Sequence, residues 1–394
     1  MTVPAPQARR RPSAAGRVLP LLLLVVLLAP LALLFAQSWR LTGDDRDLAA
    51  RERLGVQYLR ALAPVTDALV DAQSAAVAAR PASGAALTRA VEAAASVDAR
   101  VGGELRSQER WAGLRAKIEA LGDRGPADPE AAFAAYGEVT DLLLALHRKV
   151  RETSGLVRDP RSDSFFLQDA AGRDLPEAVV ATGRLADLTV LAARRAAADR
   201  DRTTGELAAL RVAALAPAGD LVADLRAAVD SSASTDLGPN VLTPLDTYQR
   251  AVEALAAHSA PAGRSGVVDP AQVAGARLNA QAAARLLQPV ILGELDALLA
   301  ERADGLDRDR RLTVAAGVLA VLLCGALGAV WLAAARRARR RAAEGRREQE
   351  GPDAPAADTP WQPPTRDGDP RQLQPAGPVG EPGRAQWGPF DAAR

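Results

Sequence analysis

Residue types from which catalytic and metal sites are usually built are scarce in this chain of 394 residues. The single cysteine, Cys324, lies in a long apolar run, so no intrachain disulfide can form and the side chain is interpreted as an apolar filler. The two histidines, His147 and His258, belong to no set of cysteine, histidine and carboxylate residues with metal-ligand spacing. No motif marks a nucleophile beside a base. We therefore predict no enzymatic activity, no metal site and no cofactor.

Lysine is almost absent too, and its scarcity makes arginine the main carrier of positive charge. Lysine occurs only as Lys117 and Lys149, which together with abundant alanine and glycine is typical of a GC-rich genome. The net charge of +1 is distributed as +4 over residues 1–17, −5 over residues 18–335 and +2 over residues 336–394. A mildly acidic central region argues against a nucleic-acid partner.

Two uncharged apolar runs, residues 18–36 and 312–335, frame the central region. Each has about the 20 residues that a helix needs to cross the hydrocarbon layer. Signal peptides have shorter apolar regions, so an uncleaved anchor is favoured for the first run, with a cleaved signal peptide as the alternative. Trp39 and Trp331 lie near the run ends, where indole rings prefer the membrane interface.

Arginine clusters on the far sides of both runs predict the orientation. The first 17 residues carry four arginines and no acid, and RRARRRAAEGRR follows the second run from Arg336. Such clusters stay cytoplasmic, so we expect both termini on the cytoplasmic side of the plasma membrane. The second cluster is also expected to hold anionic lipid headgroups. The predicted divisions are a basic N-terminus (1–17), a first transmembrane helix (18–37), an extracytoplasmic domain (38–311), a second transmembrane helix (312–335), and a basic juxtamembrane segment with a tail (336–394).

The extracytoplasmic domain is predicted to be an all-α, elongated helical bundle of the four-helix or coiled-coil kind. Gly55, Tyr58, Leu62, Val65 and Leu69 step by three and four residues, which forms one apolar stripe on a helix. No alternating strand pattern competes with this interpretation. Pairs such as Asp-Pro and Thr-Pro combine a capping oxygen with a proline suited to a first helical turn. They predict helices at about 41–79, 85–121, 129–157, 163–199, 203–230, 244–259 and 270–311, with starts at Pro129, Pro160, Pro244 and Pro270.

The region from 345 to 394 is dense in proline, glycine, glutamine and charge. It cannot bury enough apolar surface to fold, so we expect a disordered cytoplasmic tail.

Two motifs resemble a known group of proteins. RERLGVQYLRAL (residues 51–62) and TSGLVRDPRSDSFFLQD (residues 153–169), the latter followed by Leu175-Pro176, resemble the extracytoplasmic helical sensor region of bacterial methyl-accepting chemotaxis proteins and related transmembrane signal transducers. The resemblance covers roughly residues 50–200. It implies a homodimer in which a stimulus outside shifts the membrane helices.

The chain departs from that group after the second apolar run, where residues 336–394 match neither a HAMP relay nor a signalling domain. We therefore expect a sensor-like protein that detects an unknown small molecule or protein outside and relays it to a separate cytoplasmic signalling partner. The alternative is a membrane-anchored structural or scaffolding protein that binds another envelope protein and senses nothing.

The two motifs contain the residues that are candidates for ligand binding. Arginine on an external helix can hold a carboxylate or phosphate with two parallel hydrogen bonds, although such residues more often form a solvated face. Aspartate and paired aromatics after a proline can line a site, but they can equally cap and lock a helix junction. The candidates are Arg51, Arg53, Tyr58, Arg60, Asp159, Asp163, Phe165 and Phe166.

Two prolines are hinge candidates. Pro64 and Pro289 lie 27 residues after and 23 residues before the predicted spans, which places both roughly 35–40 Å above the membrane. An interior proline bends a helix. We predict that the first and last external helices are neighbours and that both prolines face one layer of the bundle.

Overall fold

The computed structural model describes residues 15–80, 84–123, 128–157, 162–260 and 268–349. Most of the predicted basic N-terminus and most of the predicted tail therefore lie outside the described residues. Of the described chain, 92% is helical and none is strand, which confirms the all-α prediction. The elements are α1 (Ala15–Val77), α2 (Gly84–Val101), α3 (Gln108–Asp123), α4 (Pro129–Ser154), α5 (Ser162–Asp169), the π-helix η1 (Ala170–Asp174), α6 (Leu175–Arg194), the 3₁₀ turn η2 (Ala197–Asp199), α7 (Arg200–Ser231), α8 (Leu237–His258) and α9 (Pro270–Gln349).

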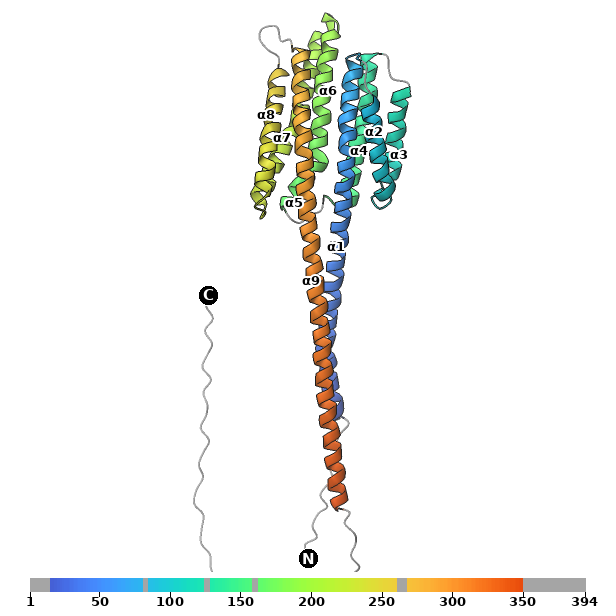
Figure 1. The fold of residues 1–394 in the computed structure, drawn as a ribbon, viewed down its shortest axis with the longest axis vertical. Helices are drawn as coiled ribbons and strands as arrows, with labels where there is room; N and C mark the ends of the chain where they lie inside the picture. Colours follow the sequence, from blue (N-terminus) through green and yellow to red (C-terminus); the bar gives the residue numbers. More distant parts are fainter. Residues whose placement is uncertain (1–14, 81–83, 124–127, 158–161, 261–267, 350–394) are drawn as a thin grey trace, which may run out of the picture. The chain divides into compact units, whose positions relative to one another are not determined.

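The chain divides into two compact units, Met1–Leu323 and Cys324–Arg394, and the packing described here lies within the first. In that unit α1 contacts α2, α4 and α6, and α3 completes a group with α2 and α4. A second group follows, in which α5 and α6 pack on α7, α7 packs on α8, and α8 hydrogen-bonds to α9 through Asn240 and Glu294. In Figure 1, α2, α3 and α4 lie on the α1 side, α7 and α8 lie on the α9 side, and α6 appears between α1 and α9. One apolar core runs through both groups.

The predicted apolar stripe of α1 forms part of that core. Tyr58, Leu62, Val65 and Leu69 are all at most 1% exposed. Their burial follows from the helical repeat, because positions three and four residues apart lie on one face. The stripe prediction is confirmed.

Three predicted helix boundaries are wrong. The helix expected at 85–121 is two helices, because the chain turns after Gly102-Gly103 and Arg106 has a positive φ of 49°. The helix expected at 163–199 is interrupted by η1 and ends at Arg194. Pro244 does not start a helix, since α8 begins at Leu237 and carries Pro244 inside it.

Two predicted caps are confirmed. Asp128 accepts a hydrogen bond from the Ala131 amide at 2.9 Å, with Pro129 in the first turn of α4. Asp269 accepts one from the Ala271 amide at 2.9 Å, at the start of α9. Both satisfy an amide that lacks a partner within the helix. Pro160 and its predicted cap Asp159 lie outside the described residues.

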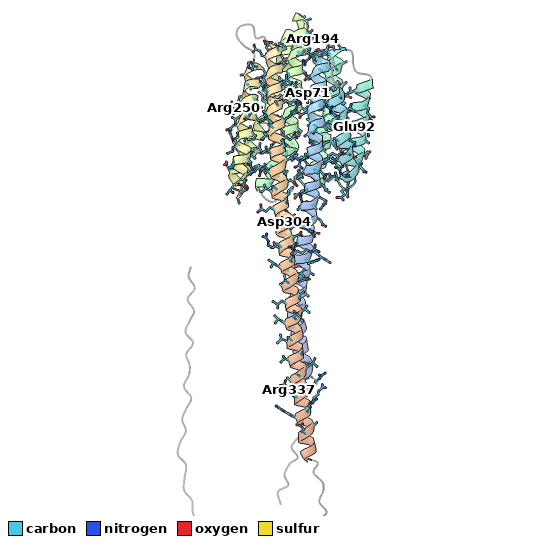
Figure 2. The ribbon with its side chains drawn as sticks, in the orientation of Figure 1. Asp71, Glu92, Arg194, Arg250, Asp304 and Arg337 are labelled. Carbon is cyan, nitrogen blue, oxygen red and sulfur yellow. The ribbon has the colours of Figure 1, made fainter. Side chains whose placement is uncertain are left out.

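Helices α1 and α9 are antiparallel neighbours, which confirms that prediction. Arginines bridge them along their length, from Arg46–Asp307 at 3.0 Å through Arg53–Asp296 at 2.9 Å to Arg285–Asp67 at 2.9 Å. Over the whole row, the 21 residues from Arg46 to Asp67 on α1 match the 22 residues from Asp307 to Arg285 on α9. We call this row of contacts the α1–α9 seam. Asp71, labelled in Figure 2, accepts from Arg285 at 2.8 Å near its upper end.

Pro64 and Pro289 lie at similar heights on the seam, because Arg60 below Pro64 reaches the Leu292 carbonyl and Asp67 above it pairs with Arg285. Both prolines are exposed. Each lies inside a helix that continues past it. Their role as a hinge stays a prediction.

One helix of the described chain, within α9, is long and apolar enough to cross a membrane. Its most apolar window has a mean hydropathy of 2.4 and no residue buried against the protein. The first apolar run belongs to α1, but the side chains of residues 15–25 lie outside the described part. Val26, Leu33 and Leu34 beyond them are at least 60% exposed.

A glycine substitution tests the packing of α1 on α4. A Cβ added at Gly55 would lie 2.6 Å from Ser154 Cβ and 2.9 Å from Leu156 Cδ1. We expect Gly55→Ala to lower the free energy of unfolding by about 1–3 kcal/mol, because the added methyl overpacks a buried contact. The matched control is Gly113→Ala in α3, where nothing lies within 4 Å. That change should stabilise by roughly 0.5–1 kcal/mol through helix propensity. Denaturant unfolding measures both, and equal effects would contradict the close packing.

Candidate functional site

The arginine candidates on α1 are engaged within the protein. Arg51 donates to the Asp47 carbonyl one turn earlier at 3.2 Å. Arg53 pairs with Asp296, and Arg60 donates to the Leu292 carbonyl at 3.4 Å, so both contribute to the seam. The structure thus places these arginines in helix contacts, and it does not gather them around a cavity.

Tyr58 is buried in the core and not available at the surface. Its hydroxyl donates to Asp98 Oδ1 at 2.8 Å, and the Ser107 hydroxyl donates to the same oxygen at 3.1 Å. Burial raises the pKa of the Tyr58 hydroxyl. These contacts tie α1 to α2 and to the turn before α3.

The candidates of the second motif lie apart from those arginines. Asp159 and the side chain of Asp163 lie outside the described residues. Phe165 is 36% exposed, whereas Phe166 is half-buried against the core. Their rings meet edge to face with centroids 5.6 Å apart. This geometry fits a locked helix junction.

The two motifs nevertheless contact each other. Gly55 of the first lies against Ser154 and Leu156 of the second. Gly155, between them, ends α4 with a φ of 92°, and a Cβ there would meet Leu48 of α1. Glycine suits both positions because each leaves no space for a side chain and the second needs a positive φ. The motifs therefore build one junction between α1 and α4.

The second motif leads directly into the π-helix η1, which sits where α5 passes into α6. A π-turn adds a residue to the helical repeat, and such turns are frequent at functional sites. Gly172 in η1 faces the side chain of Arg151, and a Cβ there would lie 2.7 Å from Arg151 Cγ. The glycine thus makes room for a buried arginine beneath the turn.

A cluster of charged residues surrounds this π-turn. Arg151 pairs with Asp169, and their side chains are 8% and 10% exposed. Arg173 reaches Asp169 Oδ2 at 2.9 Å and Asp174 Oδ1 at 2.8 Å. Its other nitrogen lies 3.8 Å from Asp224 Oδ2 on α7. The π-turn cluster, defined as Arg151, Asp169, Arg173, Asp174 and Asp224, therefore links α4, α5, η1 and α7.

The two carboxyls at the α7 side of the cluster, Asp174 and Asp224, both have raised pKa values. Burial first, and then hydrogen bonding and the nearby charges of Asp174 and Asp169, raise the pKa of Asp224 to about 7. Burial also raises the pKa of Asp174. The buried Oδ2 atoms of both accept no conventional hydrogen bond from the described residues, so a proton shared between the two carboxyls would satisfy them. We assign this proton to Asp224, because Arg173 holds Asp174 at hydrogen-bonding distance and favours its charged form.

Other charged groups face the pair from neighbouring elements. Glu177 of α6 has its pKa raised by burial, and Arg151 of α4 has its pKa lowered by burial. Tyr248 of α8 is buried, and the charge of Asp174 helps raise its pKa. With one proton on the pair, the five residues of the π-turn cluster balance to zero net charge. Loss of this proton leaves one uncompensated negative charge in a site that is partly shielded from water.

His147 of α4 is buried in the protein. Burial lowers the pKa of its imidazole to about 3, so the ring is neutral, and it hydrogen-bonds to Thr66 Oγ1 at 3.3 Å. No group of three histidine, cysteine or carboxylate residues within the described ranges could hold a metal ion.

Sequence reasoning missed most of the π-turn cluster. Asp169 ends the second motif, so its position offered a signal, and Gly172 follows three residues later. Arg151 and Asp224 offered none, because one lies in an ordinary polar helix stretch and the other is more than 50 residues away. Only the fold brings them together.

In comparisons with known proteins, no family model matches the chain, and no curated protein or solved structure matches it either.

Proposed function

We propose that the protein is a membrane-anchored sensor whose external helical bundle detects a ligand or partner and relays the change to a separate output protein. The observation that carries this proposal is continuity: α1 and α9 each run unbroken from the bundle into an apolar stretch. The seam holds the two helices in a matched register. A shift of one against the other inside the bundle would reach the apolar ends.

The membrane arrangement belongs to the same proposal. We place residues 18–37 and 312–335 in the plasma membrane, residues 38–311 outside, and both termini in the cytoplasm. Exposed apolar side chains such as Leu34, Leu312 and Val321 support lipid contact for both segments. Apolar side chains gain by leaving water, and lipid provides that environment.

The resemblance to chemoreceptor sensor regions supports sensing over scaffolding. It also suggests a homodimer with lipid contacts. The segment after residue 335 is rich in proline, glycine and charge, so we propose that a separate cytoplasmic protein receives the signal. The π-turn cluster and the junction of the two motifs lie where α1, α4, α6 and α7 meet, which is a suitable place to couple the two helix groups.

The relay can be measured with nitroxide labels at Asp44 and Arg308, both exposed on the lower seam, in a Cys324→Ala background. Full-length protein is screened for compounds that raise the apparent melting temperature, since a ligand of the folded state stabilises it. A bound compound is expected to shift the label separation by about 1–2 Å, the size of helix shifts in signalling transitions. A compound that stabilises the bundle and leaves the separation unchanged would favour the scaffolding alternative.

A matched pair of variants tests whether the seam carries the shift. Asp296→Ala removes the seam partner of Arg53 and should reduce the ligand-induced change in separation. Glu119→Ala removes an exposed pair with Arg115 within α3 and should leave the change intact.

A further inference from the structure

A group of aromatic residues and arginines connects α1 and α9 at the level where the apolar runs begin. The Arg310 guanidinium of α9 lies over the Trp39 ring of α1 at 4.1 Å. Phe35 stacks on Trp39 with centroids 6.2 Å apart and rings inclined by 17°. Phe35, one turn from Trp39 on α1, also packs against Gly317 of α9. These contacts continue the register of the seam down to the boundary between charged and apolar residues.

The charged residues that lie nearest the two apolar runs are positive, and the nearest acidic residues, Asp44 and Asp309, lie just beyond them on the side away from the runs. Residues 36–43 and 310–323 contain Arg40, Arg310 and Arg311 and no acidic residue. Higher on the seam, arginine and aspartate pair, as in Arg46–Asp307. In the described part of the chain, no carboxylate oxygen lies within 4.0 Å of a nitrogen of Arg40, Arg310 or Arg311. Three arginines without a carboxylate partner therefore gather at one level.

A shallow cavity, largely open to solvent, lies at the same level. It has a volume of about 500 Å³ and is lined by Arg46, Asp307, Arg310, Arg311, Val314 and Ala315. Its upper lining is charged, and its lower lining, from Val314 on, is apolar. Asp307 is held by Arg46 at 3.0 Å, so the lining charge left without a partner is positive. This order of charge above and methyl groups below matches the headgroup and glycerol region of a phospholipid.

We propose that this cavity binds the phosphate of an anionic glycerophospholipid in the outer leaflet. The proposal rests on the membrane orientation given under the proposed function. Arg310 and Arg311 hold the phosphate, since guanidinium groups match phosphate oxygens with paired hydrogen bonds. Trp39 packs at the interface, and the acyl chains follow the apolar face below Val314. A lipid in this position contacts α1 and α9 together, so the headgroup composition of the outer leaflet biases the relay.

The test measures which lipid lies beside the cavity. Full-length Cys324→Ala protein carrying Gly43→Cys is labelled with a fluorophore and reconstituted in vesicles. Quenching by spin-labelled phosphatidylglycerol is compared with quenching by spin-labelled phosphatidylcholine. One arginine near an anionic surface contributes about 1 kcal/mol, which corresponds to roughly fivefold in affinity. We expect at least about a fivefold preference for phosphatidylglycerol, lost in Arg310→Gln/Arg311→Gln.

The controls separate the possible outcomes. Arg110→Gln/Arg115→Gln, two exposed arginines of α3, should keep the preference. Millimolar inorganic phosphate should not abolish it; if it does, the site is a free-anion site and the lipid proposal is overturned. Equal quenching by both lipids in the parent protein also overturns it. Ala260→Cys tested with an impermeant maleimide in intact cells reports orientation independently, so an unlabelled cysteine at this position would refute the membrane orientation and not the lipid preference.

Discussion

Asp169→Ala is expected to lower the free energy of unfolding by about 3–5 kcal/mol, the usual cost of leaving a buried charge without its partner. Asp169 accepts from both Arg151 and Arg173, and the Arg151 side chain is only 8% exposed. Removing the carboxylate leaves the Arg151 guanidinium without this partner under the π-turn, where water cannot replace the lost contact. Denaturant unfolding of the full chain in detergent, followed by far-UV circular dichroism, measures the loss.

Asp141→Ala is the control for this experiment. Asp141 pairs with Arg184 at 2.7 Å, but its side chain is 66% exposed. Exposed ion pairs contribute about 0–1 kcal/mol, and Arg184 keeps its bonds to Thr140 and to the Gly137 carbonyl. Similar losses in the two variants would mean that the cluster is solvated in the native protein.

Stability is expected to fall by about 2 kcal/mol more in the parent protein than in Asp224→Asn between pH 5 and pH 8. The folded-state pKa of Asp224, about 7, lies above the ordinary aspartate value of about 3.9. A group with a raised pKa stabilises the fold fully below its unfolded value, and that contribution is lost as the pH rises through the folded value. Each unit of difference is worth about 1.4 kcal/mol, and the 20% exposure of the side chain reduces the total.

Unfolding curves of both proteins at several pH values between 5 and 8 measure the difference. Asparagine at position 224 can donate to Asp174 at every pH, so the variant should lose this part of the pH dependence. Comparing the two proteins also removes the contribution of Asp187, whose pKa burial raises to about 6. Asp230→Asn, an exposed change on the same helix, should follow the parent curve. Parallel curves for Asp224→Asn and the parent would show that the pair holds no proton near neutral pH.

The helices could be predicted largely from the sequence because their signals are local. The stripe through Leu62 and Leu69 follows the helical repeat, and the caps Asp128 and Asp269 precede prolines that fit a first turn. The turn after Gly102 could not be predicted, because two glycines alone do not decide between a helix end and a tolerated interruption. The Thr-Pro pair at Pro244 is equally ambiguous, since a helix can also carry a proline inside it when tertiary packing outweighs the lost hydrogen bond.

The candidate site was much harder to predict than the fold. An arginine such as Arg53 looks the same in the sequence whether it binds a ligand or a neighbouring helix. Only the fold, which places α9 beside α1, shows that Arg53 pairs with Asp296. The packing around the π-turn is tertiary, since the stem of Arg151 on α4 lies against Gly172. The contribution of a charged residue to this cluster depends on how deeply its side chain is buried, and no short stretch of sequence encodes that burial.

The matched register of α1 and α9 makes their lengths interdependent. One residue inserted into a helix rotates everything beyond it by about 100° and lifts it by about 1.5 Å. An insertion in α1 alone, between Arg46 and Arg53, would turn one partner of every lower contact away from the other. A compensating insertion between Asp296 and Asp307 in α9 would restore the phase. Exchanging the bundle for another helical bundle therefore requires both helices to be cut at the same level, for which the Arg46–Asp307 pair marks a suitable position.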